Sequence, residues 1–222
     1  ITSEVNEGKI TSSRIGYVFT HDTRLYKLGP KNGILFNLGQ EFIGLGGDKT
    51  GLRTTLKAAA QKEAFKEEVK LTAVFEAGLL TYTSGNSRVM DRFFLGSQKM
   101  RGFEPGGLGP RECLNRQCGV SNNDTLGGEN FAVVRFEAEF PLGLPEEYGF
   151  SGGVFYDIGN LWSLQKLNND VLYEDGSWRH AIGASIFWNT PIGPLRFNFT
   201  EALKKEIHDR DESFDLTIST RF

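Results

Sequence analysis

Residues 130–140 read NFAVVRFEAEF, and this stretch decides the fold class. Apolar side chains occupy every second position from Ala132 onward, whereas Arg135, Glu137 and Glu139 lie between them. Successive side chains of a β-strand point to opposite faces of the sheet. The segment therefore predicts a strand with one dry face and one wet face.

The same alternation recurs along the chain and predicts further strands of similar length. A strand in a soluble protein has about 5–6 residues, whereas a tilted strand that spans a membrane needs about 9–11. Most of the predicted strands reach the longer figure, and no helix of any length is predicted. The expected strands cover residues 10–20, 32–45, 51–64, 69–82, 130–140, 147–160, 180–190, 194–200 and 214–222.

The connections between these strands alternate between tight turns and long loops. Turns near Lys66 and Pro145 are short, whereas the excursions at 84–128, 163–178 and 203–211 are long. Short turns on one rim and long loops on the other are typical of a transmembrane barrel. The alternative is a soluble sandwich or ligand-binding barrel with its dry face inward. The strand length and the charged wet face favour an all-β, antiparallel transmembrane β-barrel.

Composition argues against several other classes. The 25 Lys and Arg against 28 Asp and Glu give a net charge of −3, which offers no basic surface for a nucleic acid. No apolar run reaches the roughly 18 residues of a membrane-spanning helix. Residues 1–4, ITSE, do not resemble a signal peptide, so we expect a mature or excised chain.

Signals for an enzyme are weak, and we expect no catalytic residues and no cofactor. The stretch at residues 46–51, GGDKTG, departs from a phosphate-binding loop because Leu52 and Arg53 follow it. The three histidines, His21, His180 and His208, are too far apart along the chain to suggest a metal site, and we expect them at the surface.

The two cysteines lie in the longest loop. Cys113 and Cys118 are separated by four residues, and no further zinc ligands lie nearby in the sequence. A small disulfide that closes a loop fits an oxidising compartment, with two free thiols as the alternative.

The loop at 84–128 also holds the candidate functional residues. Irregular connections longer than about 12–15 residues usually have a function or are disordered. Within this loop, Arg101 could reach Glu137 and Asp157, which the strand pattern places inside the barrel together with Phe155. A guanidinium is suited to bidentate pairing with a carboxylate. The alternative, that Arg101 is a solvated loop charge, stays open on these grounds.

Several motifs resemble the Omp85 superfamily. Residues 100–103, MRGF, resemble its (V/I)RG(F/Y) loop signature, with Met100 where the family more often has Val or Ile. Residues 153–159, GVFYDIG, resemble its GxFxDxG strand. Residues 136–141, FEAEFP, resemble the preceding strand, and residues 185–222 are similar to the last three strands.

The resemblance implies that the loop folds back into the lumen, where Arg101 pairs with Asp157 and Glu137. It also implies a barrel of sixteen strands, of which residues 1–222 are a partial barrel domain with the C-terminal nine and without the family's periplasmic POTRA domains. We name the expected docking site the loop latch. Its members are Arg101, Gly102, Phe103, Glu137, Phe155 and Asp157.

The resemblance further implies a function in the bacterial outer membrane without any bond being made or broken. Its assembly branch folds and inserts β-barrel proteins. The expected partners are unfolded outer-membrane proteins, outer-membrane lipid and, through the POTRA domains, assembly lipoproteins, but no nucleic acid. The alternative is a two-partner secretion pore that exports one dedicated protein. The terminal strand would act as a lateral gate through Phe214, Leu216, Ile218 and Phe222.

Overall fold

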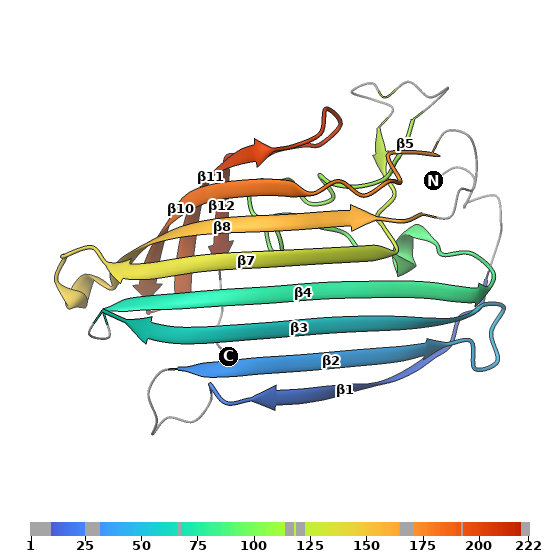
Figure 1. The fold of residues 1–222 in the computed structure, drawn as a ribbon, viewed down its shortest axis with the longest axis horizontal. Helices are drawn as coiled ribbons and strands as arrows, with labels where there is room; N and C mark the ends of the chain where they lie inside the picture. Colours follow the sequence, from blue (N-terminus) through green and yellow to red (C-terminus); the bar gives the residue numbers. More distant parts are fainter. Residues whose placement is uncertain are drawn as a thin grey trace.

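The computed structural model describes residues 10–24, 32–65, 68–113, 118, 123–164, 171–191 and 193–218. Nine long strands form one antiparallel sheet in the order β1-β2-β3-β4-β7-β8-β10-β11-β12 (Figure 1). Each strand pairs with the long strands before and after it in the chain. The strands are β1 (Arg14–Asp22), β2 (Gly33–Ile43), β3 (Thr50–Ala64), β4 (Val69–Ser84), β7 (Asn130–Pro141), β8 (Phe150–Trp162), β10 (Arg179–Thr190), β11 (Gly193–Lys204) and β12 (Phe214–Ile218).

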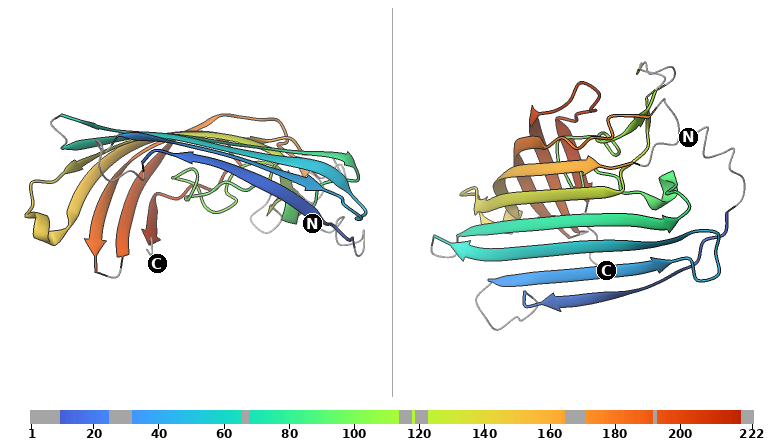
Figure 2. Two further views of the ribbon diagram at one scale, coloured as in Figure 1. Left: turned by 90° about the horizontal axis from the view of Figure 1, so that it is seen from below. Right: turned by 45° about the vertical axis from the view of Figure 1, so that its right-hand side comes forward.

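The sheet curves into part of a barrel wall. Figure 2 shows the strands arching over the loop that connects β4 to β7, which lies on the concave side. In the described part of the chain, β1 and β12 form the two edges of the sheet and do not pair with each other. Within the same ranges, no helix is long and apolar enough to cross a membrane.

The predicted faces of β7, β8, β11 and β12, for which the alternation was read residue by residue, are confirmed. Phe136 and Leu216 are 48% and 47% exposed on the convex face, whereas Asp157 on the concave face is 0% exposed. A soluble barrel would have gathered the apolar side chains in its centre. The sheet instead turns its apolar face outward and its charged face inward, as expected for a wall in contact with lipid.

The strand ends differ from the prediction where local contacts compete with strand pairing. Residues 10–13 lie outside β1, because Thr11 and Ser13 bind the connection between β2 and β3: the Thr11 backbone N–H donates to Asp48 Oδ2 at 2.8 Å. β8 begins at Phe150 because residues 146–148 form a 3₁₀ turn and Gly149 has a φ of +67°. Residues 219–222, including Phe222, lie outside the described residues.

The long loops contain a small sheet that the sequence did not predict. After the 3₁₀ turn η1 (Val89–Asp91), the loop forms β5 (Arg111–Glu112) and β6 (Asp124–Thr125). Strand β9 (Val171–Leu172), from the loop after β8, completes the sheet in the order β6-β5-β9. Pairs of two residues are too short for a periodic pattern. A disulfide joins Cys113 and Cys118 next to β5.

The core lies between the loop and the concave wall. Met100, Phe103 and Leu108 of the loop are fully buried against the apolar inward side chains of the sheet. Burial of one such side chain stabilises the fold by about 1.5–3 kcal/mol. The loop is therefore held in place by packing as well as by charge. The wall side of this cluster includes Phe131, Val133 and Leu161.

Candidate functional site

The loop latch is centred on a bidentate ion pair. Arg101 Nε donates to Asp157 Oδ2 at 2.7 Å, and Arg101 Nη2 donates to Asp157 Oδ1 at 2.5 Å. The backbone N–H of Arg101 also donates to Asp157 Oδ2, at 3.1 Å. Arg101 is 5% exposed, so both charges are removed from water and depend on each other.

Two further residues of the latch contact the Arg101 guanidinium. Nη1 of Arg101 donates to the carboxylate of Glu137 on β7. The guanidinium carbon lies 3.6 Å from the ring centroid of the buried Phe155 on β8, which is a cation–π contact. The pleat explains this convergence, because Glu137 and Phe155 are direct partners in the β7–β8 register.

Gly102 and Phe103 anchor the loop to the far side of the site. Gly102 has a φ of +85°, and a Cβ there would lie 2.6 Å from Cγ2 of Thr200 on β11. The Gly102 carbonyl accepts a hydrogen bond from the Glu212 N–H at 3.0 Å. Phe103 is fully buried and forms an isolated bridge with Asp211. Only glycine therefore allows this approach of the loop to β11.

The wall provides matching space beside Met100. A Cβ at Gly159 of β8 would lie 2.4 Å from Met100 Sδ, so the absence of a side chain at Gly159 admits the loop. Met100 is fully buried there.

A second arginine reaches Glu137, and sequence reasoning did not single it out. Arg196 on β11 donates through Nη2 to the Glu137 carboxylate and through Nε to Asn198 Oδ1, the latter at 2.7 Å. The only signal in the sequence was its inward position in the alternating stretch 194–200. Its partner is decided by the tertiary arrangement of β7 and β11.

The expectation of surface histidines is wrong for His208. This side chain is 8% exposed and stacks on Tyr173, with ring centroids 3.7 Å apart. It lies in the loop between β11 and β12, and burial lowers its pKa. The neighbouring Arg179 forms an ion pair with Asp209, Nε to Oδ2, at 2.9 Å. The long loops thus pack into a cap that buries polar side chains.

Comparison with known proteins identifies the family. A model of the Omp85 superfamily domain matches residues 2–222. The chain belongs to the Omp85 superfamily. Three of the six latch residues, Arg101, Gly102 and Phe103, lie in the signature that suggested the family, and two more, Phe155 and Asp157, lie in its strand motif.

Relatives of this Omp85 chain include outer-membrane assembly factors. It is 31% identical over 194 residues to "Outer membrane protein assembly factor BamA" of Neorickettsia risticii, covering 87% of this chain and 25% of the relative. The BamA of Nitratidesulfovibrio vulgaris is 26% identical over 199 residues, covering 87% and 23%. The mouse "Sorting and assembly machinery component 50 homolog" is 27% identical over 164 residues, covering 71% and 33%.

A solved structure supports the fold. BamA from Haemophilus ducreyi lacking POTRA domains 1–3 superposes with a TM-score of 0.74 at 18% identity, covering 94% of this chain and 42% of that one. The Omp85 chain spans about a quarter of the length of the two BamA relatives named above. Its place is the bacterial outer membrane, as for those relatives.

The expected gate residues lie on the terminal strand of this Omp85 chain. Phe214, Leu216 and Ile218 share the convex, exposed face of β12. In the described residues β12 pairs with β11 alone, through five register partners from Phe199↔Phe214 to Leu195↔Ile218. Within the same residues it forms one edge of the sheet.

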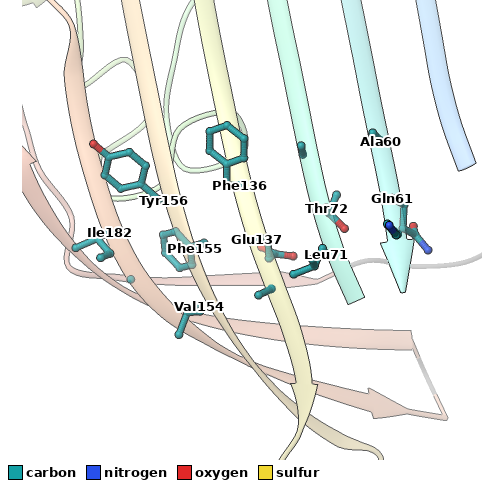
Figure 3. A pocket seen from close by; sticks show the side chains of 14 residues that line it. Ala60, Gln61, Leu71, Thr72, Phe136, Glu137, Val154, Phe155, Tyr156 and Ile182 are labelled. Atoms are coloured by element: carbon teal, nitrogen blue, oxygen red, sulfur yellow. The ribbon is translucent and has the colours of Figure 1, made fainter. Parts of the chain in front are cut away.

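The wall of this Omp85 chain carries an apolar hollow of about 590 Å³ (Figure 3). The small side chains of Ala60 and Ala73 leave space beside the ring of Phe136, with which they share one row of the sheet register. Tyr156 and Ile182 continue this row across β8 and β10. Such a hollow on the convex face would be filled by lipid. Within the described ranges, no group of three or more His, Cys, Asp or Glu is placed to hold a metal ion.

Proposed function

We propose that this chain is the membrane-embedded part of a factor that folds other β-barrel proteins and inserts them into the outer membrane. The observation that carries the proposal is that the terminal strand β12 lies at the edge of the described sheet, whose apolar face points outward. The names of the relatives, which are assembly factors, support the same function.

The proposed mechanism is strand templating. Unpaired backbone N–H and C=O groups cost several kcal/mol each in hydrocarbon, which opposes the entry of an unfolded strand into a membrane. An exposed sheet edge offers these groups partners through β-augmentation. Because β12 pairs on one side only within the described residues, it is the strand that could separate from its neighbour to admit a client strand. No covalent step and no cofactor is required, so the chain acts as a template and not as an enzyme.

The proposed partners follow from this mechanism. Unfolded outer-membrane proteins would pair with the β12 edge, and lipid would cover the convex face around Phe136 and Leu216. Assembly lipoproteins would bind through POTRA domains in the full-length gene product.

The latch has a proposed supporting role. Arg101, held by Asp157 and Glu137, keeps the loop against β7 and β8, and Gly102 contacts β11 beside the terminal strand. A docked loop would hold the wall rigid while β12 pairs and unpairs. We infer that loss of the latch lowers assembly without dissolving the sheet, because the strand ladder does not pass through the loop.

A reconstituted assembly assay tests this function. The full-length gene product is placed in lipid vesicles with an unfolded barrel protein, and the folded client is measured by its heat-modifiable migration on a gel. Arg101→Ala should lower the yield of folded client, whereas Arg24→Ala, which breaks the exposed Arg24–Asp22 pair, should not. Export of one dedicated protein with no insertion of others would instead support a secretion pore.

A further inference from the structure

A continuous set of polar contacts runs along the concave wall from the loop to the terminal strand. We name it the polar chain. It begins at Arg101 in the loop and crosses β7 and β11 before it reaches β12. Its members are Arg101, Glu137, Arg196, Asn198 and Asp215.

Glu137 is the point at which the loop and β11 meet. Its Oε2 accepts hydrogen bonds from Nη1 of Arg101 and from Nη2 of Arg196. Arg196 Nη1 also lies 3.4 Å from Glu137 Oε1. The two guanidiniums therefore share one carboxylate. The loss of either arginine changes the electrostatic interaction of Glu137 with the remaining one.

Asn198 carries the contact from β11 to β12. It is 1% exposed, and its Oδ1 accepts from Arg196 Nε and from Ser185 Oγ, both at 2.7 Å. Its Nδ2 donates to Asp215 Oδ2 at 2.9 Å. The oxygen and the nitrogen of this buried amide are both hydrogen-bonded. Loss of one of these hydrogen bonds would lower the free energy of unfolding by about 1–3 kcal/mol.

The last contact bears on the register of β12. Asn198 and Asp215 are direct partners in the β11–β12 ladder. A slip of one residue would turn Asp215 to the convex face, and a slip of two would place it opposite Arg196 or Thr200. A slip would leave the buried Asn198 amide without this acceptor, so the contact favours the observed register.

Arg196 has room to move. A hollow of about 330 Å³ lies beside the polar chain, and its bordering residues include Arg101, Glu137, Arg196, Asn198 and Thr217. If the loop left the wall, Arg196 would be the cation of the polar chain that still pairs with Glu137. The Arg196 guanidinium could then turn toward Glu137 and away from Asn198. The amide that holds Asp215 would then lose a fixed partner.

We propose that Arg196 and Asn198 are positioning residues that couple the docking of Arg101 to the register and pairing of β12. Loop docking then stabilises the terminal strand, and loop release loosens it. The biological use of this coupling rests on the proposed function, since a client strand would enter beside β12. The coupling itself is a property of the wall and exists without a client.

Hydrogen exchange of the amides at residues 214–218 tests the coupling. It is measured by mass spectrometry on the full-length gene product in detergent, with no client present. Arg101→Ala and Arg196→Met should each speed exchange in β12 about fivefold or more. The double variant should exchange no faster than the faster single variant, because both changes break the same chain. Lys70→Met is the matched control: it breaks an inner-wall pair with Glu139 at 3.4 Å, outside the polar chain.

Variants at Asp215 separate coupling from general loosening. Asp215→Asn keeps an oxygen that accepts from Asn198, so β12 should exchange close to the parent rate, whereas Asp215→Ala should exchange faster. Should Arg101→Ala fail to fold, Glu137→Gln takes its place in the same comparison. Unchanged β12 exchange in the Arg101 or Glu137 variant would overturn the proposal, as would rate effects that multiply in the double variant. Intact coupling in a protein that fails to assemble clients would count against the proposed function alone.

Discussion

Asp157 binds the Arg101 guanidinium through both carboxylate oxygens, with Oδ2 at 2.7 Å from Nε and Oδ1 at 2.5 Å from Nη2. The pair joins a loop to the middle of a barrel wall, and water is excluded from both groups. Removal of one partner from a buried ion pair is more damaging than the net strength of the pair suggests, because the other charge stays buried without compensation. The docking of the loop thus depends on this contact.

Asp157→Asn is expected to release the loop. The variant leaves the Arg101 guanidinium with one neutral oxygen at this position and with Glu137 as its remaining carboxylate, and we expect docking to weaken by about 1.5–3 kcal/mol. Limited proteolysis of residues 84–128 in the folded protein measures the release. Asp22→Asn, which alters the exposed Arg24–Asp22 pair, is the control and should leave cleavage unchanged. Equal protease resistance of the Asp157 variant and the parent would show that packing alone holds the loop.

Gly159→Ala is expected to push the loop away by steric overlap. The new Cβ would meet Met100 Sδ at 2.4 Å, and overpacking of this kind costs about 1–3 kcal/mol. Met100→Val shortens the loop side chain and should restore part of the docking in the Gly159→Ala background. Loop proteolysis measures both variants. If the double variant is cleaved faster than Gly159→Ala alone, the overlap with Met100 is not the cause.

Mild acid is expected to loosen the loop cap around His208. Burial lowers the pKa of this imidazole from its ordinary value of 6.5, although Asp209 opposes the shift and Arg179 and Arg111 reinforce it. As pH falls below about 6.5, the unfolded segment binds a proton that the packed segment does not, so the packed form loses stability. The protection factors of the amides at residues 205–213, which correct for the intrinsic pH dependence of hydrogen exchange, should therefore fall between pH 7.5 and 5. His208→Phe keeps a ring against Tyr173 and should remove this pH dependence.

Reduction of the disulfide is expected to have a local effect. The Cys113–Cys118 bridge closes a loop with a sequence separation of 5. From chain entropy, a bridge of this size stabilises the folded state by about 2 kcal/mol. Reduction should speed exchange in β5, β6 and β9 but leave the amides around Arg101 and Asp157 protected, since the latch is held by the barrel wall. Release of the latch on reduction would show that the disulfide also holds the loop on the wall.

In the isolated 222-residue chain, we expect the backbone groups at the two edges of the sheet to find hydrogen-bonding partners. Within the described residues β1 and β12 each pair on one side only, which favours closure of the sheet on itself, pairing edge to edge with a second chain, or aggregation. Light scattering and cross-linking in detergent distinguish these outcomes. A stable monomer with an open sheet would contradict the expectation.

The sequence alone determined which side chains face lipid and which face the lumen. This followed from the alternation around Phe136 and Glu137, because the pleat of a strand assigns each side chain to a face without reference to the rest of the fold. The same rule placed Phe155 and Asp157 inside. The pairing of Arg101 with carboxylates was one of two readings from the residues, and the family motifs favoured it.

Only the tertiary structure decided which inward groups meet. Arg196 and Glu137 lie on strands that are not neighbours, and the curvature of the sheet brings them together. His208 is buried because separate loops pack over it, and β5 pairs with β9 across more than 50 residues of chain. Local periodicity contains no information on such contacts, since they depend on how the wall bends and on what covers it.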